Sequence, residues 1–338
     1  MGQIITALIE VFKNPAFYNN VIAVTPPILL AALGCAIAQK ADMTNMGMEG
    51  IMLLSSFIGT LAAAYIGGPN PWLGLLVAVV VGGVLGYLVA FFNLKMKVDI
   101  VLVGIAMNLF GTGATAFFLP LVTPNADRSS TNSLQSGMLP TVNIPGIKNI
   151  PILGEVLSNQ NILTYISYAL IFVMAFLIFK TKLGLRIRAV GENASAAESV
   201  GISSTKIKTI ALIISGCLGG IGGAFMSSVY VSYFANGIVA GRGFIGLAAC
   251  SMGEANPIPT ALTSILFGFF YGLSNFARAT GISDNIMKMW PYLATLIGVV
   301  IYSIIKARNE KKRLAGLATS DTSDKKVEEK GRQYFKTK

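Results

Sequence analysis

The sequence contains no histidine, and only 12% of its 338 residues are charged. Histidine is the commonest general base and a frequent zinc ligand, so its absence excludes the usual zinc chemistry and leaves no expected metal site. The three cysteines, Cys35, Cys217 and Cys250, stand singly among small apolar residues, which predicts packing rather than disulfide bonds. No Gly-Lys pair occurs, so the chain lacks the loop G-x-x-x-x-G-K-[ST] and cannot bind ATP by it.

The residues that are present indicate a membrane protein. Hydrophobic residues make up 54% of the chain and the mean hydropathy is +0.67, which is typical of a polytopic membrane protein. The net charge is +11, but 16 of the 41 charged residues lie at or after Lys306. The basic excess therefore favours contact with anionic lipid headgroups rather than with nucleic acid. The sequence starts without a basic segment and a cleavage site, so no removable signal peptide is expected.

Long apolar runs divide the chain into membrane spans. A hydrocarbon core about 30 Å thick requires about 20 apolar residues per helix. We therefore predict an all-α, polytopic transmembrane helical bundle of about nine spans, within a range of 8–10. The expected spans are residues 21–38, 49–66, 72–92, 99–122, 161–179, 209–234, 240–255, 260–277 and 290–305. The run 240–255 is short, so it either crosses the membrane or re-enters on one side.

The segments outside the expected membrane domain (residues 21–306) differ in character. Residues 1–20 contain an amphipathic stretch too short to span, which predicts an interfacial segment. The polar residues 123–160 are expected to form an outer loop, and the basic residues 307–338 a disordered tail. If residues 180–208 are cytoplasmic, alternation of the spans places Lys40, Lys95, Lys97 and the whole tail on the same side, which then holds 20 of the 26 Lys and Arg residues. We therefore expect a multi-pass protein of the cytoplasmic membrane with a cytoplasmic C-terminus.

Residues 180–208 form a charged, polar interruption between two apolar runs. Their sequence, KTKLGLRIRAVGENASAAESVGISSTKIK, predicts a solvated helix or pair of helices that something outside the chain binds. The apolar run that follows contains five glycines in the eight positions from Gly216 to Gly223. Such a run either lets neighbouring helices approach closely or marks a break in the helix.

A few polar residues near the expected spans are candidates for a transport pathway. Asn45 and Glu49 either line the cytoplasmic end of a pathway or cap a helix. Asn108 lies inside an expected span, so its amide needs either a neighbouring helix or a substrate as partner. Arg242, between two glycines, is suited either to an anion at a helix start or to a lipid headgroup. No acidic residue is expected near the middle of a span, which weakens the case for an ion-driven carrier.

Four stretches resemble one known family. GLRIRAVGENASAAESVGIS resembles the cytoplasmic coupling segment of ABC importer permeases, in the branch that serves branched-chain amino acids, simple sugars and nucleosides. TNMGMEGIMLL, DIVLVGIAMNLF and AGRGFIGLAACSMGEANPIPTALTSILFG are similar to further stretches of that branch. The four occur in the family's order within residues 21–305, and the chain looks closest to nucleoside or sugar permeases.

The resemblance implies a transport function for the chain, which would not be an enzyme. Separate ATPase subunits would bind ATP and Mg, this chain would bind no cofactor, and alternating access would move a nucleoside or simple sugar. Further implied partners are a second permease, identical or homologous, and an extracellular or lipoprotein solute-binding protein. The implied ATPase-coupling residues are Arg188, Gly191, Glu192, Asn193, Ala196, Ala197 and Gly201. Ser195 stands where the general E-A-A-x-x-x-G pattern has an acid, and nearby Glu192 is the candidate for the electrostatic contact.

Two other classes of protein are alternatives. An ion-coupled secondary carrier or a channel would need no ATPase, and ion-driven uptake into vesicles would identify it. A membrane-embedded enzyme is disfavoured because the chain has no histidine and the spans have no paired carboxylates.

Overall fold

The computed structural model describes residues 15–66, 70–123, 137–142 and 160–278, with isolated positions between 293 and 308. The chain separates into two units, Met1–Tyr292 and Leu293–Lys338, and the first unit contains every element discussed below. The expected amphipathic stretch, most of the expected outer loop, most of the span 290–305 and nearly all of the tail lie outside the described residues.

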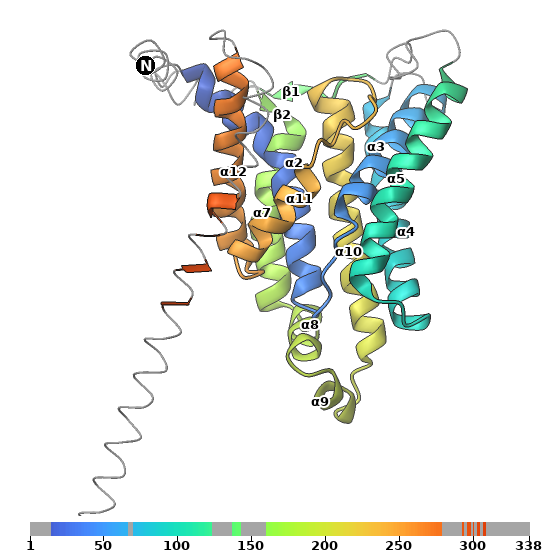
Figure 1. Ribbon diagram of the computed structural model, residues 1–338, viewed down its shortest axis with the longest axis vertical. Helices are drawn as coiled ribbons and strands as arrows, with labels where there is room; N and C mark the ends of the chain where they lie inside the picture. The colour runs from blue at the N-terminus through green and yellow to red at the C-terminus, as the bar shows by residue number, and fades with distance from the viewer. Residues whose placement is uncertain are drawn as a thin grey trace, which may run out of the picture. The chain divides into compact units, whose positions relative to one another are not determined.

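The described part of the first unit consists mainly of helices (Figure 1). The α-helices are α2 (Pro15–Gln39), α3 (Met48–Tyr65), α4 (Pro71–Ala90), α5 (Ile100–Val122), α7 (Ile162–Lys180), α8 (Lys182–Glu192), α9 (Ala194–Ser199), α10 (Ser204–Phe225), α11 (Arg242–Met252) and α12 (Pro257–Arg278). π-Helical turns extend two of them, η1 (Phe91–Lys95) after α4 and η2 (Met226–Tyr230) after α10. Two short antiparallel strands, β1 (Thr141–Val142) and β2 (Gln160–Asn161), pair Thr141 with Asn161.

Seven helices in the described residues are long and apolar enough to cross a membrane: α2, α3, α4 with η1, α5, α7, α10 with η2, and α12. They correspond to seven of the nine expected spans. The short run 240–255 contains only the 11-residue helix α11, about 16 Å long, which is half the thickness of a hydrocarbon core. The count of nine is therefore not confirmed.

Polar residues at the helix starts explain where several helices begin. At the start of α4, the Asn70 side chain accepts hydrogen bonds from the N–H groups of Trp72 and Leu73. At the start of α5, the Asp99 side chain accepts them from the N–H groups of Val101 and Leu102. Asn161 and Thr181 cap α7 and α8. These side chains satisfy N–H groups that have no partner inside their own helix.

Helix α2 lies at the centre of the bundle and contacts α7, α10, α11 and α12 (Figure 1). Its whole circumference is buried from Val24 to Ala38. Pro26 lies inside α2 and has no N–H to donate to the carbonyl of Ile22. The Tyr168 hydroxyl of α7 donates to that carbonyl instead, at 3.4 Å. A neighbouring helix thus supplies a hydrogen bond that the proline removes, as a membrane interior requires.

Small residues bring α4 and α10 into backbone contact. A Cβ atom on Gly216 of α10 would collide with the carbonyl of Gly82 on α4, and one on Gly86 would collide with the carbonyl of Leu212. The glycine run from Gly216 to Gly223 therefore serves close approach of helices, and α10 stays helical through it.

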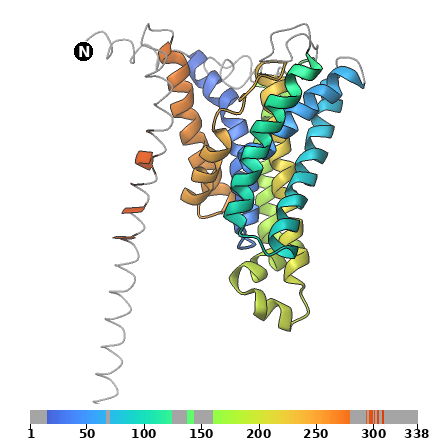
Figure 2. The same ribbon diagram turned by 45° about the vertical axis from the view of Figure 1, so that its right-hand side comes forward.

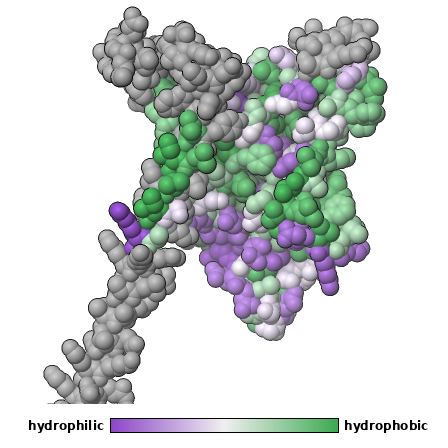
Figure 3. Space-filling model, in the orientation of Figure 1, coloured by the Kyte–Doolittle hydropathy of each residue, from purple (hydrophilic) through white to green (hydrophobic). Residues whose placement is uncertain are grey.

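Helices α8 and α9 lie beyond one end of the bundle, between α7 and α10 (Figures 1 and 2). Hydrophilic residues gather on this end in the space-filling view, whereas hydrophobic residues cover much of the bundle's side (Figure 3). This distribution fits a bundle embedded in lipid with one polar end in water.

Candidate functional site

The membrane crossing that contains α3 is broken, because its first part is not helical. After α2 ends at Gln39, residues 40–47 are not helical, and the chain turns back into the bundle. Asn45 is fully buried there, where its Nδ2 donates to the Ser215 hydroxyl of α10 at 3.0 Å and its Oδ1 accepts from the Gly47 N–H at 3.2 Å. Met48, the first residue of α3, packs against Gly34 and Gly219. Helix α3 therefore begins inside the bundle, and residues 40–65 are named the first broken crossing.

Helix α3 receives its cap from another helix. The Asn108 side chain of α5 accepts a hydrogen bond from the Gly50 N–H at 2.8 Å and donates to the Met46 carbonyl at 2.9 Å. Of the two partners that the sequence left open for Asn108, the structure supplies a neighbouring helix. A Cβ atom on Gly50 would collide with the Met107 carbonyl, so α3 and α5 touch backbone to backbone at this cap.

A second broken crossing follows α10. Residues 231–241 contain no helix, and α11 starts at Arg242 after Gly241, whose φ of +78° lies in the left-handed region. The Glu49 carboxylate, from the first turn of α3, accepts hydrogen bonds from the Gly241 and Gly243 N–H groups, each at 2.8 Å. A carboxylate at a helix N-terminus satisfies its N–H groups and complements the helix dipole. Glu49 thus caps α11, not its own helix, and residues 231–252 are named the second broken crossing.

Arg242 is a buried cation within the second broken crossing. Its side chain is only 3% exposed, and its guanidinium carbon lies 4.4 Å from the ring centroid of Tyr271 and 5.3 Å from that of Tyr230. Its Nη1 donates to the carbonyls of Ile238 and Val239. Two aromatic faces and two carbonyls therefore stabilise its charge, and among the described residues it forms no ion pair within 4.0 Å. Its burial leaves no surface for the lipid headgroup that the sequence allowed.

The second broken crossing ends beside the end of α2. The Lys40 ammonium donates to the Glu254 carbonyl at 3.2 Å, just after α11. Helix α12 then runs antiparallel to α2, with Gly268 against Thr25 and Gly272 against Val21. The short helix α11 and the non-helical residues around it therefore carry the chain from the far end of α10 to the α8–α9 end.

Each of the four pathway candidates lies at or beside these two helix starts. Asn45 precedes α3, Glu49 joins α3 to α11, Asn108 caps α3, and Arg242 begins α11. Their contacts are with protein groups, so a role in lining a pathway stays a prediction. Ser215, Tyr230 and Tyr271 contact these residues but were not singled out from the sequence. Tyrosine is common in the spans, and no spacing marked these two.

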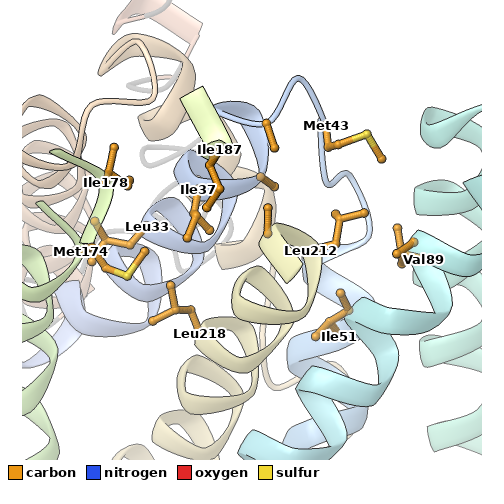
Figure 4. Packing of buried hydrophobic residues seen from close by; sticks show 14 of the residues in the cluster. Leu33, Ile37, Met43, Ile51, Val89, Met174, Ile178, Ile187, Leu212 and Leu218 are labelled. Carbon is orange, nitrogen blue, oxygen red and sulfur yellow. The ribbon is translucent and has the colours of Figure 1, made fainter. Parts of the chain in front are cut away.

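Helices α8 and α9 have an inner face that packs on the bundle. Ile187 and Val190 of α8 and Ala197 of α9 are buried in the main hydrophobic cluster, and Figure 4 shows Ile187 beside Ile37 of α2. A Cβ atom on Gly191 would collide with the carbonyl of Lys40 at the end of α2. Gly191 and Ala197 thus lie against the protein's own core, and their predicted contact with an ATPase stays a prediction.

The outer face of the same two helices is exposed. Asn193 caps α9 by accepting hydrogen bonds from the Ala196 N–H and the Ser195 hydroxyl. Arg188 is half-buried, with its guanidinium over the ring of Phe179. The α8–α9 surface is defined here by its exposed residues, which are Lys182, Leu185, Arg186, Glu192, Asn193, Ser195, Ala196, Glu198, Ser199, Val200 and Gly201.

Exposed apolar residues on a polar end indicate a docking surface. Leu185 is 60% exposed and Val200 is 73% exposed. Gly201 has a φ of +82° and open space where a Cβ atom would be, so nothing in the described residues covers it. The sequence indicated Gly201 but not Leu185 or Val200, which hydropathy alone does not separate from core residues.

Seven candidate spans, non-helical segments inside the bundle and an exposed helix pair are features of a multi-pass membrane protein. Residues 17–305 match the family described as Branched-chain amino acid transport system / permease component, and the chain belongs to this family. It is a permease of the ATP-binding cassette transporter class.

Three curated relatives are similar over most of their length. The guanosine ABC transporter permease protein NupQ of Bacillus subtilis is 33% identical over 81% of this chain and 87% of the relative. The nucleoside ABC transporter permease protein NupC of Lactococcus lactis is 29% identical over 84% of this chain and 90% of the relative. A second guanosine permease of Bacillus subtilis, NupP, is 25% identical over 87% of this chain and 84% of the relative.

Proposed function

We propose that this chain is the permease subunit of an importer that moves nucleosides across the cytoplasmic membrane by alternating access. The observation that carries the proposal is the 33% identity to a guanosine permease over most of both chains. A simple sugar is the second candidate substrate, because the resemblance covers that class as well.

Separate ATPase subunits would drive the transport from the cytoplasmic side. ATP and Mg would bind to those subunits, since this chain lacks a Gly-Lys phosphate loop. The α8–α9 surface would be their docking site, because it combines exposed apolar residues with charged ones at the polar end of the bundle. The C-terminal tail would lie on the same side.

The contacts at the end of α2 provide a route from the α8–α9 surface to both broken crossings. Gly191 of α8 packs on the Lys40 carbonyl, and the Lys40 ammonium holds the Glu254 carbonyl after α11. Lys208 of α10 forms an ion pair with Asp42 at 3.5 Å, in the first broken crossing. A displacement of α8 and α9 by the ATPases would therefore act on Lys40 and Asp42 and then on the starts of α3 and α11.

The complex would contain a second permease and an external solute-binding protein. Bacillus subtilis has two guanosine permeases similar to this chain, NupQ and NupP, which favours a pair of homologous permeases over a pair of identical ones. The solute-binding protein would deliver substrate to the face opposite α8 and α9.

Substitution on the α8–α9 surface tests the ATPase assignment. Gly201→Trp and Ala196→Asp are expected to abolish co-purification of the ATPase and ATP-driven uptake of radiolabelled guanosine into proteoliposomes. Gly113→Trp is the matched control, because Gly113 on α5 is also exposed with open space beside it. Wild-type co-purification and uptake in both surface variants would overturn the assignment, and uptake driven by an ion gradient without ATPase would favour the secondary carrier.

A further inference from the structure

An apolar groove lies between the end of α4 and the first half of α5. Its volume is about 530 Å³, within the range of about 300–1,000 Å³ that holds a ligand of moderate size. Its lining residues are all apolar: Leu88, Phe92, Val98, Leu102, Val103, Ala106, Met107 and Phe110. A groove without polar groups offers nothing to a nucleoside or an ion, and it suits a hydrocarbon chain.

The local backbone explains why the groove exists. The π-helical turn η1 replaces regular α-helix at the end of α4, and Lys97 follows with a φ of +57°. The Asn93 side chain then donates to the Val98 carbonyl at 2.9 Å, which fixes the turn into α5. Across the turn, the small residue Ala106 leaves space that a larger residue would fill. The groove is thus built into the connection between two membrane spans.

The open side of the groove faces the region that lipid occupies. Phe92, Leu102 and Phe110 line it and are 38%, 59% and 60% exposed. Both α4 and α5 belong to the helices that can cross a membrane. In a bilayer, these side chains meet acyl chains, so a hydrocarbon chain is the occupant that the surroundings supply.

Two exposed lysines lie at the end of the groove. Lys95 and Lys97 are both in the turn between Phe92 and Val98, which line the groove. The nearest carboxylate in the sequence, Asp99, accepts hydrogen bonds from the Val101 and Leu102 N–H groups. The turn therefore presents a net positive charge to the membrane surface, which attracts anionic headgroups.

We propose that this groove binds one acyl chain of an anionic phospholipid, whose headgroup is held by Lys95 and Lys97. The bound lipid supports the first broken crossing, because the groove wall is shared with it. Met107 lines the groove and packs on Gly47 and Gly50, and its neighbour Asn108 caps α3. An occupied groove therefore holds the turn of α5 that caps α3. This inference does not depend on the identity of the transported solute.

The proposal is tested by measuring how added phospholipid changes the thermal stability of the protein. The purified protein in a neutral detergent is mixed with phosphatidylglycerol or with phosphatidylcholine of the same acyl chains, and its melting temperature and retained lipid are measured by thermal shift and native mass spectrometry. Phosphatidylglycerol is expected to bind and to raise the melting temperature, whereas phosphatidylcholine has little effect. The double variant Lys95→Gln/Lys97→Gln is expected to bind phosphatidylglycerol about thirtyfold more weakly, taking about 1 kcal/mol for each lysine.

Two groove-filling variants separate the acyl site from a purely electrostatic contact. Ala106→Trp and Leu102→Trp are expected to lose the phosphatidylglycerol effect, whereas Gly113→Trp on the same helix and Lys180→Gln/Lys182→Gln keep it. Wild-type lipid binding in both groove variants, or in the Lys95/Lys97 variant, would overturn the proposal. Disulfide-linked dimers of Ala106→Cys, without any phosphatidylglycerol effect in the wild type, would instead assign the groove to a second copy of the chain.

Discussion

The first and second broken crossings solve the same problem with different groups. Both begin a helix inside the bundle, where its first N–H groups need a partner from outside their own helix. At α3 the cap is the neutral amide of Asn108, which also donates to the Met46 carbonyl. At α11 it is the carboxylate of Glu49, and the buried cation Arg242 follows directly. The group that caps α3 is therefore neutral, whereas the start of α11 combines a carboxylate cap with a buried cation.

This difference predicts that removing the two caps lowers the free energy of unfolding by unequal amounts. A hydrogen bond to a charged group contributes more than one between neutral groups, and a buried charge left without its partner costs more still. The second broken crossing should accordingly be the more sensitive to substitution.

The largest effect is expected for Glu49→Ala. The variant leaves the Gly241 and Gly243 N–H groups without partners, at an expected cost of about 4 kcal/mol. We expect a clearly lower melting temperature and loss of ATP-driven uptake. Glu49→Gln keeps one oxygen acceptor, so its melting temperature should fall between those of the wild type and Glu49→Ala. A wild-type melting temperature for Glu49→Ala would show that the cap does not stabilise the crossing.

A smaller effect is expected for Asn108→Leu. This change removes both hydrogen bonds to the first broken crossing, at an expected cost of about 2 kcal/mol. Thr112→Val is the control, because the Thr112 hydroxyl bonds only within α5, to the Asn108 carbonyl, and is exposed. Thermal unfolding in detergent compares the melting temperatures of the wild type, Asn108→Leu and Thr112→Val. If Asn108→Leu lowers the melting temperature more than Glu49→Ala does, the first broken crossing is the more sensitive of the two.

The smallest effect is expected for Asp42→Asn. The ion pair with Lys208 lies at the surface, with 75% of the Asp42 side chain exposed, so its contribution to stability is about 0.5 kcal/mol or less. The melting temperature should hardly change. If uptake per bound ATPase nevertheless falls, the contact transmits motion from α10 to the first broken crossing; unchanged uptake would exclude it from that route.

Much of the helix pattern was predictable from the sequence. Long apolar runs locate seven spans because a bilayer demands unbroken hydrophobicity, and Asn70 and Asp99 mark helix starts by local chemistry. How deep in the bundle a helix begins was not predictable. Glu49 looks like a residue at the end of a span, and hydropathy does not reveal that this end lies inside the bundle.

Partners far apart in the sequence were also beyond prediction. Glu49 and Gly243 are separated by 194 positions, and nothing local links a carboxylate in α3 to the start of α11. The inner face of α8 was easier to predict, since Ile187, Val190 and Gly191 recur at helical spacing. That periodicity separates the packing residue Gly191 from exposed residues of the same helix such as Arg186 and Glu192.

The glycine contacts between α4 and α10 restrict how the protein can move. Gly82 and Gly86 touch Gly216 and Leu212 through backbone atoms, so sliding one helix along the other would drive carbonyls into neighbouring turns. We therefore expect the two helices to travel as a single rigid body. Hinges are then expected in non-helical segments inside the bundle, such as residues 41–46 and 231–240, which lie between the helices.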